Sequence, residues 1–321
     1  MLSRTADHLF WMSRYTERAE NTARMLRVSY ETSMLPQPAE VVRKDWLGVL
    51  SISELIPAYY RRHEQVTRDD VLHFMVCDER NPSSIYACLQ AARENARAVR
   101  GALTSEVWET QNQTWLELTQ QLKDGRFAQD PARLLEWVKY RSHLSRGVSS
   151  GTMLQDEAFH FVRLGTFLER ADNTARLLDV KFHALEHDYH GSDPQQAGQR
   201  QFDFYHWSAL LHSVSAFEVY RKVYRDAITP ERVAELLILR RDMPRSLHAS
   251  LHEVMGHLGQ VVHEDASESL RSAGLLLAQL QYGRIGEIME TGLHAYLTQF
   301  LDRVNALGGQ ISRDFLVPEL A

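Results

Sequence analysis

The sequence predicts an all-α protein, a helical bundle built from two tandem, related halves with pseudo-twofold symmetry. Helices are favoured because glycine and proline are sparse, at 16 and 9 of 321 residues, while Ala, Leu, Glu, Arg and Gln recur along the chain. These last residues lose little conformational freedom on entering a helix. A duplication is indicated because residues 17–26 read ERAENTARML and residues 169–178 read ERADNTARLL, identical at eight of ten positions.

The repeat continues beyond this segment, with its landmarks in the same order. WLGVLSISELIPAYYRR, beginning at Trp46, matches WSALLHSVSAFEVYRK, beginning at Trp207, and NPSSIYACLQ matches MPRSLHASLH. The three landmarks recur at offsets of 152, 161 and 162 residues. Self-similarity of this kind indicates duplication of one structural unit. We therefore place the halves at 1–155 and 156–321 and expect them to pack as one continuous unit.

The individual helices are predicted from apolar periodicity and from capping residues. Asn81 followed by Pro82 predicts a helix start, because Asn is a good N-cap and Pro suits the first helical position. The Ser- and Gly-rich segment RGVSSGTML, just before the second motif, is expected to be a hinge. The predicted helices cover about 3–33, 44–62, 67–76, 81 onward and 132 onward in the first half, and about 153–187, 202–226, 230–240, 244–264 and 267–307 in the second.

Each motif helix carries a stripe of mainly apolar residues spaced alternately three and four apart. The stripe is Leu9, Met12, Thr16, Ala19, Ala23 and Leu26 in the first copy, and Phe161, Leu164, Leu168, Ala171, Ala175 and Leu178 in the second. This spacing is typical of a coiled-coil-like seam, and the small alanines allow another helix to approach closely. We expect the two motif helices to pack against each other around a pseudo-twofold axis. The same seam also suits self-association, so a homo-oligomer stays open as an alternative.

The repeated polar residues need a separate explanation. They are Glu17, Arg18, Asn21 and Arg24 in the first copy, and Glu169, Arg170, Asn173 and Arg176 in the second. Their spacing places Glu, Asn and the later Arg on one face, turned away from the seam. Three interpretations are open: a solvated face with weak helical ion pairs, a buried network in which Glu17 and Glu169 satisfy arginines from neighbouring helices, or a site where arginines bind a carboxylate or phosphate.

Because of these motif residues and the segments around them, the chain resembles the alpha-E domain family, a bacterial all-helical family named for its Glu-Arg motif. The resemblance rests on FWMSRYTERAENTARML, NPSSIYACLQAARENARAVR, EVWE and LLDVKFH, and it covers essentially the whole chain. The family motif falls on Glu17 and Arg18, with a second occurrence at Glu169 and Arg170. Met243 departs from the pattern, since the first half has Asn at the matching position.

The resemblance implies a functional context. Genes of the family typically lie beside circularly permuted ATP-grasp amidoligases and often beside transglutaminase-like peptidases, which implies a role in forming or handling peptide or amide bonds. We expect this chain to bind the ATP-grasp protein, its peptide or amino-acid substrate, or both. The eight motif residues would form the binding site, with arginines holding a substrate carboxylate while the partner activates a carboxyl group with ATP.

Catalysis by the chain itself is the alternative, as a hydrolase, a transferase or a metal-dependent bundle acting on the peptide product. The sequence contains no GxxxxGK[ST] segment, no GxGxxG after a strand and no GxSxG, which are the usual phosphate-binding and nucleophile motifs. No catalytic residue is assigned and no cofactor is expected.

Metal binding is a weaker candidate. Glu157 and His160 form a Glu-x-x-His pair, the arrangement of di-iron bundles, but the first half has no matching glutamate. His183 and His187 lie four residues apart, a spacing that can share a metal. With 15 histidines in the chain, chance matches are easy, and we expect no metal.

Composition and charge exclude other classes. The net charge is −6, and the arginines are scattered rather than gathered in a basic stripe, so nucleic-acid binding is not expected. No apolar run is long enough for a membrane span or a signal peptide. Cys77 and Cys88 are eleven residues apart and would lie about 16 Å apart on one helix, too far to bridge. The sequence therefore predicts a reduced, cytoplasmic protein.

Overall fold

The computed structural model describes residues 1–189, 197–262 and 267–316, and the side chains of all of these except 183–189 and 197–203. Within this part of the chain every regular element is a helix, and no strand occurs. The predicted all-α class is confirmed. Cys77 and Cys88 are both free thiols.

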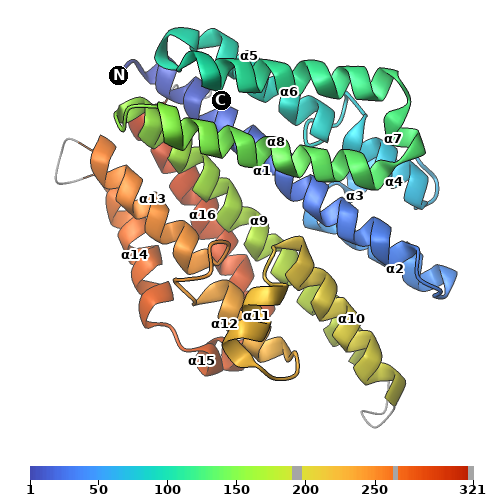
Figure 1. Ribbon diagram of the computed structural model, residues 1–321. Helices are drawn as coiled ribbons and strands as arrows, with labels where there is room; N and C mark the ends of the chain where they lie inside the picture. Colours follow the sequence, from blue (N-terminus) through green and yellow to red (C-terminus); the bar gives the residue numbers. More distant parts are fainter. Residues whose placement is uncertain (190–196, 263–266, 317–321) are drawn as a thin grey trace.

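The helices follow one another with short connections (Figure 1). Up to residue 155 they are α1 (Ser3–Ser33), α2 (Ala39–Ile52), α3 (Ile56–Tyr60), α4 (Arg68–Val76), α5 (Ile85–Ala98), the 3-10 helix η1 (Arg100–Ala102), α6 (Ser105–Lys123), α7 (Arg126–Gln129) and α8 (Pro131–Thr152). Beyond it they are α9 (Glu157–Tyr189), α10 (Ala197–Ser213), α11 (Phe217–Tyr224), α12 (Pro230–Ile238), α13 (Leu247–Val261), α14 (Glu268–Tyr282), α15 (Ile285–Thr291) and α16 (Leu293–Phe315).

Several helix starts are set by capping side chains at matching positions of the repeat. Thr67 and Thr229 accept hydrogen bonds from the backbone N–H of the third residue of α4 and α12, and Ser84 and Ser246 do the same for α5 and α13. A cap of this kind satisfies one of the N–H groups that a helix leaves without an internal partner.

The predicted helix start at Asn81 and Pro82 is wrong by a few residues, because Ser84 is the cap of α5. Asn81 instead holds the preceding turn together. Its side-chain Nδ2 donates to the carbonyl of Phe74 at 3.0 Å, and its Oδ1 accepts from the N–H of Ser83, also at 3.0 Å.

Other differences from the predicted helices occur where the backbone bends. The segments expected as single helices after Trp46 and Trp207 each break at a residue in the left-handed region, Glu54 with φ 56° and Ser215 with φ 53°. The predicted helix over 267–307 is divided into α14, α15 and the first part of α16. The predicted hinge RGVSSGTML is wrong in its first seven residues, which continue α8 as far as Thr152.

The two motif helices, α1 and α9, run side by side in the same direction through the middle of the molecule (Figure 1). This predicted pairing is confirmed. The seam alanines are buried, and the backbones come very close at Gly165, where an added Cβ would lie 2.2 Å from Ser13 Oγ and 2.3 Å from the carbonyl oxygen of Phe10. A side chain larger than hydrogen at Gly165 would force the helices apart.

The other helices cover this central pair from its flanks. α1 packs against α5 and α8, and α9 packs against α13 and α16. Each motif helix also contacts a helix from the other part of the chain, since α10 lies on α1 and α2 lies on α9. Trp46 of α2 and Trp207 of α10 are among the largest fully buried side chains. The charged face of α1 is covered by α8, by α9 and by the turn before α13.

Candidate functional site

The Glu-Arg motifs of α1 and α9 form reciprocal ion pairs across the seam, the glutamate of each motif with the arginine of the other. Arg170 donates two hydrogen bonds to Glu17, Nε to Oε1 at 2.9 Å and Nη2 to Oε2 at 3.0 Å. Arg18 donates two to Glu169, Nε to Oε1 at 2.5 Å and Nη2 to Oε2 at 3.0 Å. Bidentate pairs of this geometry are the strongest side-chain hydrogen bonds that proteins form. Each motif therefore supplies the partner that the other motif needs.

The first motif is surrounded by additional cations. Glu17 accepts a third bond from Arg146 of α8 at 2.9 Å and a fourth from Arg245, just before α13, at 3.2 Å. Glu20, one turn along α1, accepts from Arg245 at 2.5 Å and from Arg24 at 2.7 Å. These contacts connect α1 to α8 and to the turn before α13 at one level of the bundle.

The electrostatics keep the buried carboxylates ionised. Burial alone would raise the pKa of Glu17, but the attraction of Arg170 and Arg245 outweighs it, so the pKa is lowered. The pKa of Glu169 is lowered to about 2, since Arg14 and Arg18 together outweigh the effect of burial. A buried charge is stable only when it is paired in this way.

The last arginine of each motif makes a second pair of matching contacts. Arg24 of α1 donates from Nη1 to Ser215 Oγ at 2.7 Å, and Ser215 is the left-handed residue that follows α10. Arg176 of α9 donates from Nη1 to Glu54, the left-handed residue that follows α2. Glu54 and Ser215 occupy the same position in the repeat, 161 residues apart. The two arginines thus hold the ends of α2 and α10 in corresponding ways.

The burial of the eight motif residues decides between the interpretations of this face. Glu17, Asn21, Arg24, Glu169 and Arg170 are buried, whereas Arg18, Asn173 and Arg176 are partly exposed. The solvated-face interpretation is wrong for the five buried residues, and their contacts are those of the structural network. The polar face, which was expected to turn away from the seam, is covered by Arg146 of α8 and by Arg245 in the turn before α13, and its glutamates also pair with arginines of the other motif helix. A binding role for the motif stays a prediction.

Asn21 is only half satisfied within this network. Its Oδ1 accepts from Arg245 Nη1 at 2.8 Å, while its Nδ2 has no hydrogen-bond partner among the described residues.

Sequence reasoning missed several members of the network. Glu20 sits inside the motif but is not among the eight residues predicted as the site. Arg146 lies in the segment taken for a hinge, and Arg245 occupies the repeat position that holds Ser83 in the first half. The one available signal was the arginine itself, a charged residue at a repeat position that holds serine in the first half.

Of the candidate metal ligands, Glu157 and His160 lie among the residues whose side chains are described, and each has a different partner. Glu157 is hydrogen-bonded to the amino group of Met1, and His160 Nδ1 lies 2.9 Å from Nδ1 of His257, a hydrogen bond between two rings. Burial lowers the pKa of both rings, that of His257 to about 4. His183 and His187 lie outside the residues whose side chains are described. Among the described residues, no group of three or more His, Cys, Asp or Glu side chains is placed to hold a metal.

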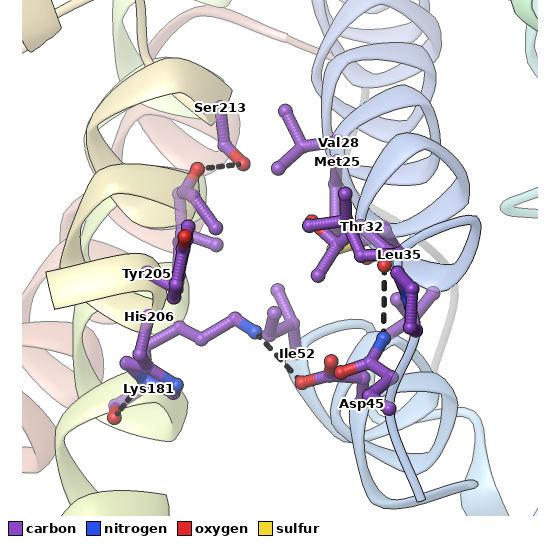
Figure 2. Close-up of a pocket in the computed structure, with 16 residues that line it drawn as sticks. Met25, Val28, Thr32, Leu35, Asp45, Ile52, Lys181, Tyr205, His206 and Ser213 are labelled. Atoms are coloured by element: carbon purple, nitrogen blue, oxygen red, sulfur yellow. Dashed lines mark hydrogen bonds and ion pairs between the residues drawn. The ribbon is translucent and has the colours of Figure 1, made fainter. Parts of the chain in front are cut away.

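A cavity of about 390 Å³ opens between α1, α2, α9 and α10, beyond the last turn of the motif. Figure 2 shows its two walls, with Met25, Val28 and Thr32 on one side and Tyr205 on the other. The wall is mainly apolar, and an ion pair crosses the cavity, Lys181 Nζ to Asp45 Oδ1 at 3.7 Å. A mainly apolar pocket with a few convergent polar groups is the usual form of a small-molecule site.

Within the described ranges, no helix combines the length and the apolar character that a transmembrane span requires.

Comparison with known proteins agrees with the Glu-Arg geometry. A family model, Alpha-E, described as a predicted alpha-helical domain with a conserved ER motif, matches residues 1–316. The uncharacterized proteins Mb2597 of Mycobacterium bovis and Rv2567 of Mycobacterium tuberculosis are each 23% identical over 334 residues, covering 94% of this chain and 35% of their own length. The chain thus spans about a third of the curated relatives it matches, and no solved structure matches it. Because the family model covers nearly the whole sequence, the chain belongs to the Alpha-E family.

Proposed function

We propose that this chain is the helical partner of an ATP-grasp amidoligase system in the cytoplasm and binds the ligase, its peptide or amino-acid substrate, or both. The observation that carries the proposal is membership of the Alpha-E family over residues 1–316, together with the much greater length of the mycobacterial relatives. A segment that makes up about a third of a longer protein acts beside other parts of that protein. A helical component working next to a separate catalytic unit fits this organisation.

The hydrogen-bonded network favours a structural rather than a catalytic role for the buried motif residues. Every carboxylate oxygen of Glu17 and Glu169 is engaged by a guanidinium, so neither is free to accept a proton from a substrate. The motif residues within reach of a partner are the partly exposed ones, Arg18, Asn173 and Arg176. In our proposal the guanidinium groups of Arg18 and Arg176 hold a carboxylate while the ATP-grasp partner activates the carboxyl group to be joined.

The proposal includes the two-half organisation, with 1–155 and 156–321 related by an approximate twofold axis along the α1–α9 seam. Its support is the reciprocity of the contacts: Glu17 with Arg170 against Glu169 with Arg18, and the matching placement of α10 on α1 and α2 on α9.

The test is co-expression of the chain with the ATP-grasp protein encoded beside it. We expect a complex that survives purification, and an ATP consumption with amino acids that changes when this chain is left out. Arg176→Ala should weaken the complex or the ligation, while Arg271→Ala, which alters an exposed ion pair with Glu268 on α14, should leave both unchanged.

Absence of a complex and of any effect on ATP consumption would overturn the partner role. The enzyme alternative would then be tested directly, by the metal content of the isolated chain and by its activity on amide substrates. A transglutaminase-like peptidase would be tried as partner in the same co-purification.

A further inference from the structure

We propose that the cavity between α1, α2, α9 and α10 binds a free apolar α-amino acid, with Lys181 contacting its carboxylate and Asp45 its ammonium group. The identity of this ligand as a ligation substrate rests on the proposed function, whereas the binding itself is a property of the chain alone. The volume of the cavity, about 390 Å³, is at the small end of the range for ligand pockets, roughly 300–1,000 Å³.

The walls of the cavity supply an apolar surround. Met25 and Val28 of α1, Val49 and Ile52 of α2, and Leu177 of α9 line it. A hydrocarbon side chain placed among them leaves water and gains roughly 25 cal/mol for each Å² buried. The cavity therefore favours a ligand with an apolar body.

The charged pair supplies the polar end. Lys181 and Asp45 are 13% and 27% exposed, and their 3.7 Å separation is too long for a hydrogen bond, in contrast to the 2.9 Å between Arg170 Nε and Glu17. Figure 2 shows the two side chains reaching toward each other from opposite walls. Each keeps hydrogen-bonding capacity that a ligand in the cavity can use.

The arrangement matches the two charges of an α-amino acid. The ammonium nitrogen and the carboxylate carbon are bonded to the same Cα, each about 1.5 Å away, so the two charges lie close together. A cation and an anion as near to each other as Lys181 Nζ and Asp45 Oδ1 are therefore complementary to such a head group. In a peptide the two terminal charges are separated by at least one residue and do not fit both partners at once.

The ion pair is also absent from the other copy of the repeat, which indicates that the fold does not need it. The position matching Lys181 is Ser29, and the position matching Asp45 is His206. Both of these line the same cavity. Burial lowers the pKa of His206 to about 3, so the ring is neutral and donates from Nε2 to the backbone carbonyl of Lys181 at 2.8 Å. The neutral His206 of α10 therefore contacts the backbone of α9. At the matching position of α2, Asp45 places a charged group near Lys181.

The test is isothermal titration calorimetry of the full chain with L-leucine, L-methionine and L-phenylalanine. We expect saturable binding of at least one of them. For that amino acid, the amide derivative, which lacks the carboxylate, and the analogue without the amino group should each bind at least about 10-fold more weakly. No binding of any of the three up to about 10 mM would overturn the assignment.

Variants locate the site. Lys181→Met should weaken binding at least about 10-fold, since the methyl end cannot pair with a carboxylate. The matched control is Lys139→Met, which removes another half-buried lysine in an ion pair, with Glu136 at 2.6 Å, outside this cavity. Ala209→Leu, which fills the cavity from α10, should abolish binding with little change in the urea midpoint. Tight binding by the Ala209→Leu variant would place the ligand elsewhere and refute the proposal.

The outcome separates the two proposals. Amino-acid binding without any complex with an ATP-grasp protein would support this site and overturn the proposed function. A complex with altered ligation but no binding by the isolated chain would support the function and overturn the site.

Discussion

Replacing one buried glutamate tests whether the Glu-Arg exchange holds the fold together. Glu17→Gln keeps the shape of the side chain but removes the charge that faces three guanidinium groups, those of Arg146, Arg170 and Arg245. Breaking a buried ion pair by removing one partner costs about 3–5 kcal/mol, because the other charge stays buried without compensation. Glu17→Gln should therefore lower the free energy of unfolding by about 4 kcal/mol.

The matching change in the second motif should cost less. Glu169 is paired with Arg14 and Arg18, whose side chains are 15% and 28% exposed, so water can partly solvate them once the carboxylate is lost. We expect about 2–3 kcal/mol for Glu169→Gln. Glu40→Gln is the control, since Glu40 forms an exposed pair with Arg43 on α2, and its removal should leave stability unchanged.

The assay is urea unfolding followed by circular dichroism at 222 nm. With an m-value of about 3 kcal/mol/M, the expected decreases in midpoint are about 1.3 M for Glu17→Gln and about 0.8 M for Glu169→Gln. Adding Arg170→Met to Glu17→Gln should recover part of the loss, because Arg170 donates both of its bonds to Glu17 and no longer stays buried without a partner. Midpoints equal to wild type for both glutamine variants would refute the structural role of the motif, as would strict additivity in the double variant.

The remaining predictions concern pH and packing. Because burial holds the pKa of His206 at about 3, below the usual 6.5, the unfolded chain takes up the proton first, and stability should fall by about 2 kcal/mol between pH 6.5 and 5. His206→Gln should reduce that loss in urea titrations at the two pH values, and an unchanged slope would contradict the assignment. Gly165→Ala should destabilise by about 1–3 kcal/mol, since its Cβ would meet the backbone of Phe10. Gly147→Ala, with open space around the new methyl group, should be neutral or stabilising, and thermal melts of the two alanine variants beside wild type check both expectations.

The structure gives a physical account of why the motif is written twice. A glutamate buried at a helix seam needs a cation in a fixed place, and the other copy of the same helix provides one. The Ala and Gly positions bring the two helices close enough for the arginines to reach across. Neither motif is complete by itself, so in our interpretation the charges and the small residues persist together.

The sequence by itself determined the helical class and the seam on each motif helix, whereas the packing of the two seams against each other was an expectation that the assembled bundle confirms. Both follow from local patterns, since helix propensity and the three-four spacing of Leu9, Met12 and Thr16 are written within one turn or two of the chain. Helix starts were less well determined, because Asn81 and Ser84 are both good caps and the choice between them depends on the contact of Asn81 with Phe74.

Only the tertiary structure decided what the charged residues do. A charged side chain on a helix is normally exposed, since burying it costs several kcal/mol unless a counter-charge is at hand. The counter-charges of Glu17 come from Arg146, Arg170 and Arg245, between 129 and 228 residues away. A local sequence pattern cannot predict contacts between residues so far apart in the chain. The ion pair between Lys181 and Asp45 is unpredictable for the same reason. Burial of a charge is a property of the assembled bundle, because it depends on helices that the local sequence does not contain.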